Sequence, residues 1–209
     1  MSGVLALGLF VGIELWLHRT NPEESALLAG AAAAGRSAGC GPATTVRPYA
    51  GDLDRAHIGG PDVATPPALS SYPSVPPVSG PHAPSPAPAG AYHNPPDVYE
   101  AIHSLEHASV IVWFDPAQTS NPEIERVRAF FSRDDEINHV LVAPYSYPTD
   151  GAAGRLPPGK DMVLAAWHHL QTCDRPSLAV AYAFVHAYRF NLYQWGSYKG
   201  DAPERFSPV

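Results

Sequence analysis

The amino-acid sequence predicts a small α+β domain with a few short strands and flanking helices, preceded by an apolar N-terminal helix and a long Pro-rich extended segment. Three observations predict this fold class. Strand-like runs alternate with helix-like periodicity only between residues 97 and 190. Half of the 24 prolines lie between Pro61 and Pro96, where they exclude an ordinary helix or a central strand. Two apolar runs dominate the first 35 residues.

The same patterns divide the chain of 209 residues into four parts. Residues 1–35 are predicted to form a membrane anchor or a helix that packs on a partner. Residues 36–96 form an extended segment that we call the strap, and residues 97–190 form the α+β domain. Residues 191–209 form an aromatic C-terminal segment that we call the tail, and its rings indicate that it packs against other parts of the molecule.

The first apolar run, Gly3–Leu17, is shorter than the roughly 20 residues of a full membrane span, and no Lys or Arg precedes it. Three alternatives are open: an uncleaved membrane anchor, a cleaved export signal, and an apolar helix packed on a partner. We favour the anchor or the partner-packed helix. The second run, Ser25–Gly35, predicts a helix with Asn21 as its cap and Pro22 at its first position.

The α+β domain begins with a helix predicted over residues 97–108, whose apolar stripe is Val98, Ile102 and Leu105. His103 and His107 lie off this stripe, so we expect them to face solvent, a second surface or a ligand.

The later elements follow in order along the chain. Residues 109–114 predict a strand, and Asn121 with Pro122 opens a helix whose buried face is Ile124, Val127, Phe130 and Phe131. A short strand is predicted over Val140–Ala143, and a last helix over residues 177–189. Residues 162–172 fit either a strand or a helix. The neighbouring His168 and His169 would point to opposite faces of a strand, one buried and one exposed.

The composition restricts the function classes. A net charge of −7 and a pI near 5.7 argue against a nucleic-acid partner, which requires a basic patch. Cys40 and Cys173 leave two alternatives open, a disulfide in an oxidising compartment and two unrelated buried thiols.

Residues 103–107 read H-x-x-E-H and carry most of the chemical information. His103 and His107 lie one helical turn apart and share a face, with Glu106 beside them, so two imidazoles can converge on one divalent ion. His82 lies on the strap just before the helix and could fold back to join them. Three imidazoles, with Glu106 as the fourth ligand or as a hydrogen-bonded neighbour of the ligands, suit copper or zinc.

Two other interpretations of these residues stay open. In the first, His82, His103, Glu106 and His107 form a hydrogen-bonded polar cluster that fastens the strap to the domain without a metal. In the second, the chain is a zinc-dependent hydrolase, because H-x-x-E-H is the signature order of one zinc peptidase class. That enzyme needs an acidic third ligand downstream, and Glu123, Glu125 and Glu136 stand in no recognisable context.

Several segments resemble the family called domain of unknown function 3105 in order and spacing over roughly residues 40–190. They are Ser79-Gly80-Pro81-His82, Gly90-Ala91-Tyr92, residues 102–107, residues 110–114, Val142-Ala143-Pro144-Tyr145 and Ala166-Trp167. The resemblance implies a bacterial protein with an N-terminal membrane segment and a domain outside the cytoplasm. Export in turn favours a disulfide between Cys40 and Cys173.

From these features we expect a membrane-associated accessory or structural subunit, not an enzyme, on the periplasmic or extracellular side of the cell membrane. Its expected partners are integral subunits of a larger respiratory or photosynthetic complex, and residues 3–17 would contact the membrane. The alternative is a metal-binding protein of the cell envelope that holds copper or zinc through His82, His103, Glu106 and His107. A zinc-dependent hydrolase is the third candidate.

Overall fold

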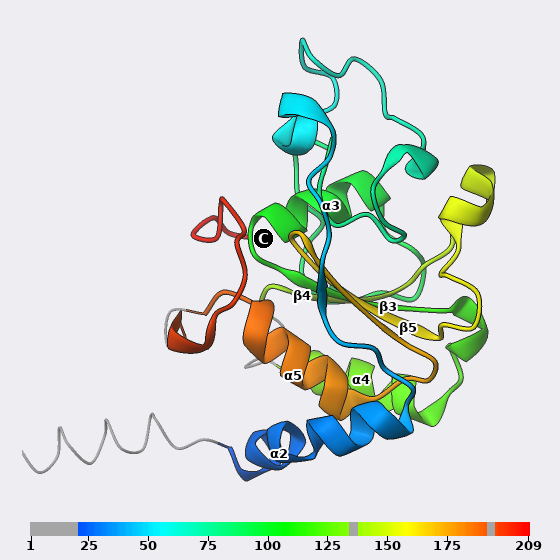
Figure 1. The fold of residues 1–209 in the computed structure, drawn as a ribbon, viewed down its shortest axis with the longest axis vertical. Helices are drawn as coiled ribbons and strands as arrows, with labels where there is room; N and C mark the ends of the chain where they lie inside the picture. The colour runs from blue at the N-terminus through cyan, green and yellow to red at the C-terminus, as the bar shows by residue number, and fades with distance from the viewer. Residues whose placement is uncertain (1–20, 134–137, 192–194) are drawn as a thin grey trace, which may run out of the picture.

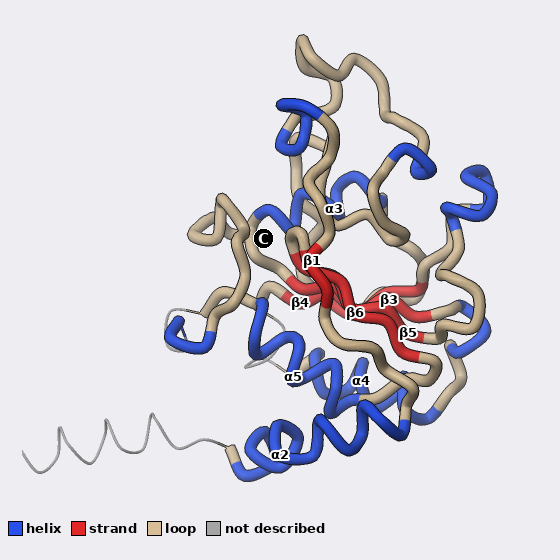
Figure 2. The backbone as a smooth tube through the Cα atoms, in the orientation of Figure 1, coloured by secondary structure: helices blue, strands red, loops and turns tan. Residues whose placement is uncertain are grey.

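The computed structural model describes residues 21–133, 138–191 and 195–209, and it confirms the α+β class. A six-stranded mixed sheet, in the order β1-β6-β5-β3-β4-β2, has helices on both faces (Figures 1 and 2). The strands are β1 (Thr44–Thr45), β2 (Gly90–Ala91), β3 (Val110–Phe114), β4 (Val140–Pro144), β5 (Met162–Ala166) and β6 (His169–Cys173). The α-helices are α2 (Pro22–Ser37), α3 (Val98–Glu106), α4 (Pro122–Phe131) and α5 (Leu178–Tyr188).

The centre of the sheet is a β-α-β unit followed by a hairpin. β3 and β4 run parallel with α4 between them, and β5 pairs antiparallel with the other edge of β3. All residues of β3, β4 and β5 are buried. Both faces of these strands are covered, which is why they appear in the sequence as continuous apolar runs without polar alternation.

Residues 162–172, which fitted either a strand or a helix, form the hairpin of β5 and β6. The two strands are joined by Trp167 and His168, and His168 adopts a left-handed φ of 57°. The expectation that His168 and His169 point to opposite faces, one buried and one exposed, was wrong. His168 lies in the turn, and both rings are half-buried beside the carboxylate of Asp201 in the tail.

The two faces of the sheet carry different layers. α4 and α5 cover one face, and α2 lies on the outside of α5 (Figures 1 and 2). α3 and the strap cover the other face, where Trp113, Leu141 and Trp167 lie in the core. The predicted buried face of α4 is confirmed, since all four of its members are at most 4 % exposed.

The helix starts follow the predicted capping residues. Asn21 caps α2 and Asn121 caps α4, each accepting a hydrogen bond from the backbone two residues on, and a proline opens both helices. Asp97 caps α3 through the backbone N–H groups of Tyr99 and Glu100. α2 runs to Ser37, beyond the apolar run that predicted it.

The strap is packed onto the domain along its length. Its β1 pairs with β6 at one edge of the sheet and its β2 pairs with β4 at the other edge. Leu69, Tyr72 and Val78 of the strap are buried in the core on the α3 side. The strap therefore protects both edges of the sheet and covers one face.

Cys40 and Cys173 form a disulfide that joins residues 133 positions apart, so the alternative of two unrelated thiols is excluded. The bond fastens the start of the strap to the end of β6. Within residues 21–133, 138–191 and 195–209, no helix has both the length and the apolar character needed to cross a bilayer. The apolar segment 3–17 lies outside these ranges.

Candidate metal centre

α3 is buried on more than one side. The apolar stripe predicted for it packs into the core, and His103, Glu106 and His107 are also at most 7 % exposed. The strap covers His103, and the tail covers His107, so these histidines face a second protein surface. In Figure 1 the C-terminus lies beside the end of α3.

The strap delivers two imidazoles to this surface. His57 and His82 form a parallel backbone bridge, in which the His82 N–H donates to Ala56 and the Ile58 N–H donates to His82. His82 is fully buried, whereas His57 is exposed and its ring stacks on His103 at a centroid distance of 5.1 Å. Sequence reasoning placed His82 here and missed His57, because nothing in the sequence indicates that bridge.

Three of the rings share one hydrogen-bond pattern. The Nδ1 atoms of His82, His103 and His107 lie 2.7–2.8 Å from the backbone carbonyls of Gly80, Ala83 and Pro208, respectively. A carbonyl oxygen only accepts, so each Nδ1 carries the proton. In the neutral ring, Nε2 then presents a lone pair. Histidines that bind metals are commonly oriented in this way.

The Nε2 atoms have no adequate protein partners. Those of His103 and His107 face each other at 2.9 Å, where two lone pairs repel unless a proton or a metal ion lies with them. The buried Nε2 of His82 lies 3.0 Å from Glu106 Oε2, but it makes no hydrogen bond of acceptable geometry within the described part of the chain. An unsatisfied buried nitrogen is costly, and a bound cation would remove that cost.

The candidate ligands form two overlapping groups. In the first, atoms of His57, His82, His103 and Glu106 all lie within 4.8 Å of one another, and the second group is His103, His107 and Glu204. All four residues proposed from the sequence are therefore brought together, but His107 belongs to a different group from His82 and Glu106. Glu204 was missed because it lies in the tail, far along the chain from the motif.

Charges around the site favour ligand-competent forms. Burial would raise the pKa of Glu106, but the ring of His82 whenever it is protonated, together with the guanidinium of Arg55, outweighs burial and holds the pKa below its usual value, so Glu106 is a carboxylate. Arg55 Nε donates to Glu106 Oε1 at 2.6 Å. Burial lowers the pKa of His103, and the neighbouring histidine rings lower it further. A neutral imidazole is the form that binds a metal.

The hydrolase interpretation gains a ligand but lacks a free base. Glu204 is an acidic residue downstream of the motif that could complete a site with His103 and His107. Glu106, which would have to act as the base, is buried and ion-paired with Arg55. Glu123 instead accepts a hydrogen bond from the backbone of Leu178, Glu125 is exposed on α4, and Glu136 lies outside the described residues.

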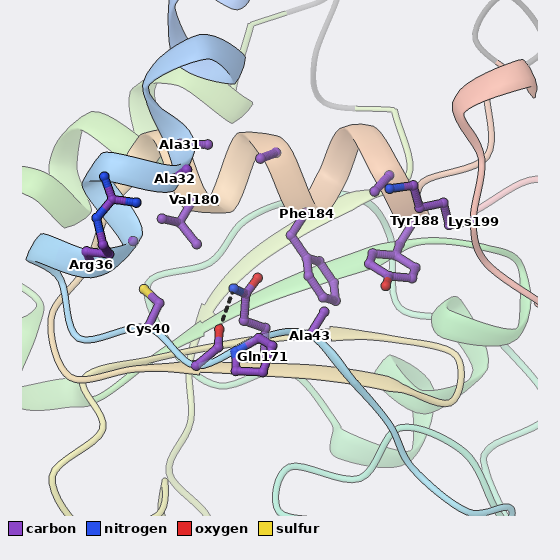
Figure 3. Close-up of a pocket in the computed structure, with 15 residues that line it drawn as sticks. Ala31, Ala32, Arg36, Cys40, Ala43, Gln171, Val180, Phe184, Tyr188 and Lys199 are labelled. Carbon is purple, nitrogen blue, oxygen red and sulfur yellow. Dashed lines mark hydrogen bonds between the residues drawn. The ribbon is translucent and has the colours of Figure 1, made fainter.

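A separate cavity of about 420 Å³ lies between α2, α5 and the start of the strap (Figure 3). Its walls are mainly small and apolar, with Arg36 toward one end and Lys199 toward the other. The amide of Gln171 inside it already donates to the carbonyl of Gly41. No histidine lines the cavity, so it belongs to a different part of the molecule from the histidine cluster.

Comparison with known proteins supports the family resemblance. A family model described as "Protein of unknown function (DUF3105)" matches residues 67–197. No curated protein and no solved structure matches the chain. The matched range includes His82, His103, Glu106 and His107, whereas His57 and Glu204 lie outside it.

Proposed function

The chain belongs to the DUF3105 family, and from the geometry of its histidine cluster we propose that it is a cell-envelope protein that binds one copper or zinc ion. The observation that carries this proposal is the convergence of three imidazoles whose Nδ1 atoms are held by backbone carbonyls, with Nε2 of His82 left without a hydrogen bond and Nε2 of His103 facing Nε2 of His107. The primary ligands are His57, His82, His103 and Glu106.

The ligand types favour copper or zinc over harder ions. Imidazole nitrogens suit copper and zinc, whereas calcium and magnesium require mainly oxygen ligands. Glu106 Oε1 is held by Arg55, which leaves Oε2 as the ligand atom. Three neutral imidazoles and one carboxylate would leave a divalent ion with a net charge of +1 in a site that is mostly buried.

The disulfide supports a location in the envelope, because such bonds persist in oxidising compartments. The site itself supports binding more than catalysis. Hydrolysis at a bound ion needs a free carboxylate that acts as the general base, and Glu106 is ion-paired with Arg55 instead.

The experiment is metal analysis of protein exported and purified without a histidine tag, followed by Zn²⁺ and Cu²⁺ titration of the chelator-treated protein. We expect about one equivalent of metal per chain and a loss of affinity of at least about tenfold in His82→Ala and His103→Ala. His186→Ala removes an imidazole of α5 outside both ligand groups and serves as the matched control. Absence of stoichiometric binding in the unmodified protein would leave a polar cluster that fastens the strap.

A second role is compatible with the first. We propose that the protein is also an accessory subunit of a membrane complex, because the centre of α2 is rich in Ala and Leu, none of its residues is fully buried although Leu27 and Ala34 pack against the core, and Leu28 is 37 % exposed. Such a surface suits a covering partner. Purification in mild detergent tests this role: we expect co-purification with integral membrane subunits, and migration as a lone monomer would contradict it.

A further inference from the structure

Arg55 arranges two carboxylates in the same way. Its Nε donates to Oε1 of Glu106 at 2.6 Å, and its Nη2 donates to Oε1 of Glu204 at 3.0 Å. The other oxygen of each carboxylate faces an imidazole nitrogen. Oε2 of Glu106 lies 3.0 Å from Nε2 of His82, and Oε2 of Glu204 lies 3.4 Å from Nε2 of His107. Each pair thus offers one carboxylate oxygen and one imidazole nitrogen to an ion.

His103 is shared by the two pairs. Its Nδ1 is bound to the carbonyl of Ala83, so Nε2 is its one ligand atom, and one lone pair holds one ion at a time. His103 belongs to both ligand groups, so the same nitrogen has to serve both. The two groups are therefore alternative, adjacent positions for a single ion.

The two positions differ in exposure. In the inner group His82 and Glu106 are at most 1 % exposed and only His57 is exposed, whereas the carboxylate of the tail group, Glu204, has a side chain that is 39 % exposed. The backbone holds Glu204 in place, since its N–H donates to the carbonyl of Glu106 at 3.1 Å and the Pro208 carbonyl accepts from His107. The tail side is therefore a built and solvent-accessible position.

We propose that His103, His107 and Glu204 form an exchange position through which the ion reaches and leaves the inner site, an inference that rests on the proposed function. During transfer the bond between the ion and His103 Nε2 is kept. Bonds to His107 Nε2 and Glu204 Oε2 break as bonds to His82 Nε2, to Glu106 Oε2 and to the ring of His57 form. The ion keeps its charge, and no electron or proton needs to be exchanged.

This arrangement has a kinetic advantage over direct binding. An ion that passes between ligands one bond at a time is never without protein ligands after it meets the tail. Arg55 keeps both carboxylates oriented throughout, because its contacts use the oxygens that do not face the histidines. His57, the exposed member of the inner group, lies on the strap and supplies no second carboxylate.

The test measures rates as well as affinity, using Zn²⁺ alone with the full chain. Stopped-flow mixing with a coloured chelator gives release, and mixing of the metal-free protein with Zn²⁺ gives uptake. In Glu204→Gln we expect both rates to fall by at least about tenfold, while their ratio, the dissociation constant, changes by less than about threefold. Glu125→Gln removes the same charge from an exposed site on α4 and is the matched control.

Other outcomes separate the two proposals. Wild-type rates in Glu204→Gln would overturn the exchange position and leave the inner site intact. Faster release with unchanged uptake would also overturn it, because Glu204 would then be a ligand of the resting ion. A fall in uptake of equal size in Glu125→Gln would show that net charge alone sets the uptake rate, and it would also overturn the exchange position. Failure of the wild-type chain to bind Zn²⁺ would instead remove the proposed function.

Discussion

The substitution Glu106→Gln tests the protonation pattern of the cluster in the metal-free protein. In the wild-type protein, the carboxylate of Glu106 accepts a charge-assisted hydrogen bond from Arg55 at 2.6 Å. Hydrogen bonds to charged groups contribute about 1.5–3 kcal/mol, and neutral ones about 0.5–1.5 kcal/mol. The side chain of Arg55 is 53 % exposed, so solvent screens further Coulomb attraction. Loss of the charge should therefore cost about 1–2 kcal/mol.

The contact between the introduced glutamine amide and His82 determines whether the cost stays at about 1–2 kcal/mol. Since Nδ1 of His82 donates to Gly80, its Nε2 in the neutral ring is an acceptor, and the N–H group of the introduced amide could donate to it. If His82 were instead charged, two donors would face each other in a buried site, and the cost would be closer to about 3–5 kcal/mol.

Urea unfolding in the presence of a chelator measures this difference. We expect a loss of about 1–2 kcal/mol, a fall in Tm of roughly 2–8 °C, and Zn²⁺ affinity at least about tenfold weaker. Glu125→Gln should change neither stability nor affinity. A loss above about 3 kcal/mol would refute a neutral His82, and wild-type Zn²⁺ affinity would refute Glu106 as a ligand.

Three further predictions concern the strap and its attachments. Burial lowers the pKa of His168, but its hydrogen bonds to Asp54 and to Asp201 in the tail outweigh burial and raise the pKa above its usual value. The charged ring therefore stabilises the fold fully below about pH 6.5, and this stabilisation is lost as the pH rises through the raised pKa. Unfolding free energy measured as the pH is raised from about 6 through the raised pKa of His168 should fall less in His168→Gln than in the wild type. The bond between Cys40 and Cys173 closes a loop of 133 residues, so its reduction should lower the unfolding free energy by up to about 5 kcal/mol in paired urea titrations. His57→Ala should weaken Zn²⁺ binding by roughly tenfold in calorimetry while leaving the metal-free stability within about 0.5 kcal/mol.

The helices and central strands were predictable because their signals are local. A capping residue followed by proline marks the starts of α2 and α4, and continuous apolar runs mark β3 and β4. β1 and β2 were not predictable, since two residues carry no periodicity and their pairing depends on distant chain. The hairpin of β5 and β6 was ambiguous because a short apolar run fits both periods.

The site divides in a similar way. His103, Glu106 and His107 were found because helical spacing alone places them together. His82 was a reasonable addition because it lies close in sequence to α3. His57 and Glu204 depend on a backbone bridge within the strap and on the docking of the tail, and neither contact leaves a pattern in the sequence.

Arg55, His57 and Glu204 extend the short H-x-x-E-H motif into the larger candidate site. All three lie outside the range matched by the family model, whereas His82, His103 and His107 lie within it. Among the described residues of the matched range, the candidate ligands are the imidazoles of His103 and His107, the strap imidazole of His82 and the carboxylate of Glu106. The negative charge of this carboxylate has to be balanced by a cation. The flanking segments add the guanidinium, a further imidazole and a second carboxylate. Because strap and tail must both be docked before these groups meet, an ion that binds them stabilises the docked state, by about 2.7 kcal/mol at a concentration 100 times its dissociation constant. If the proposed ion binds, its binding is coupled to the docking of the strap and the tail on α3, so a change that loosens either segment should weaken Zn²⁺ binding.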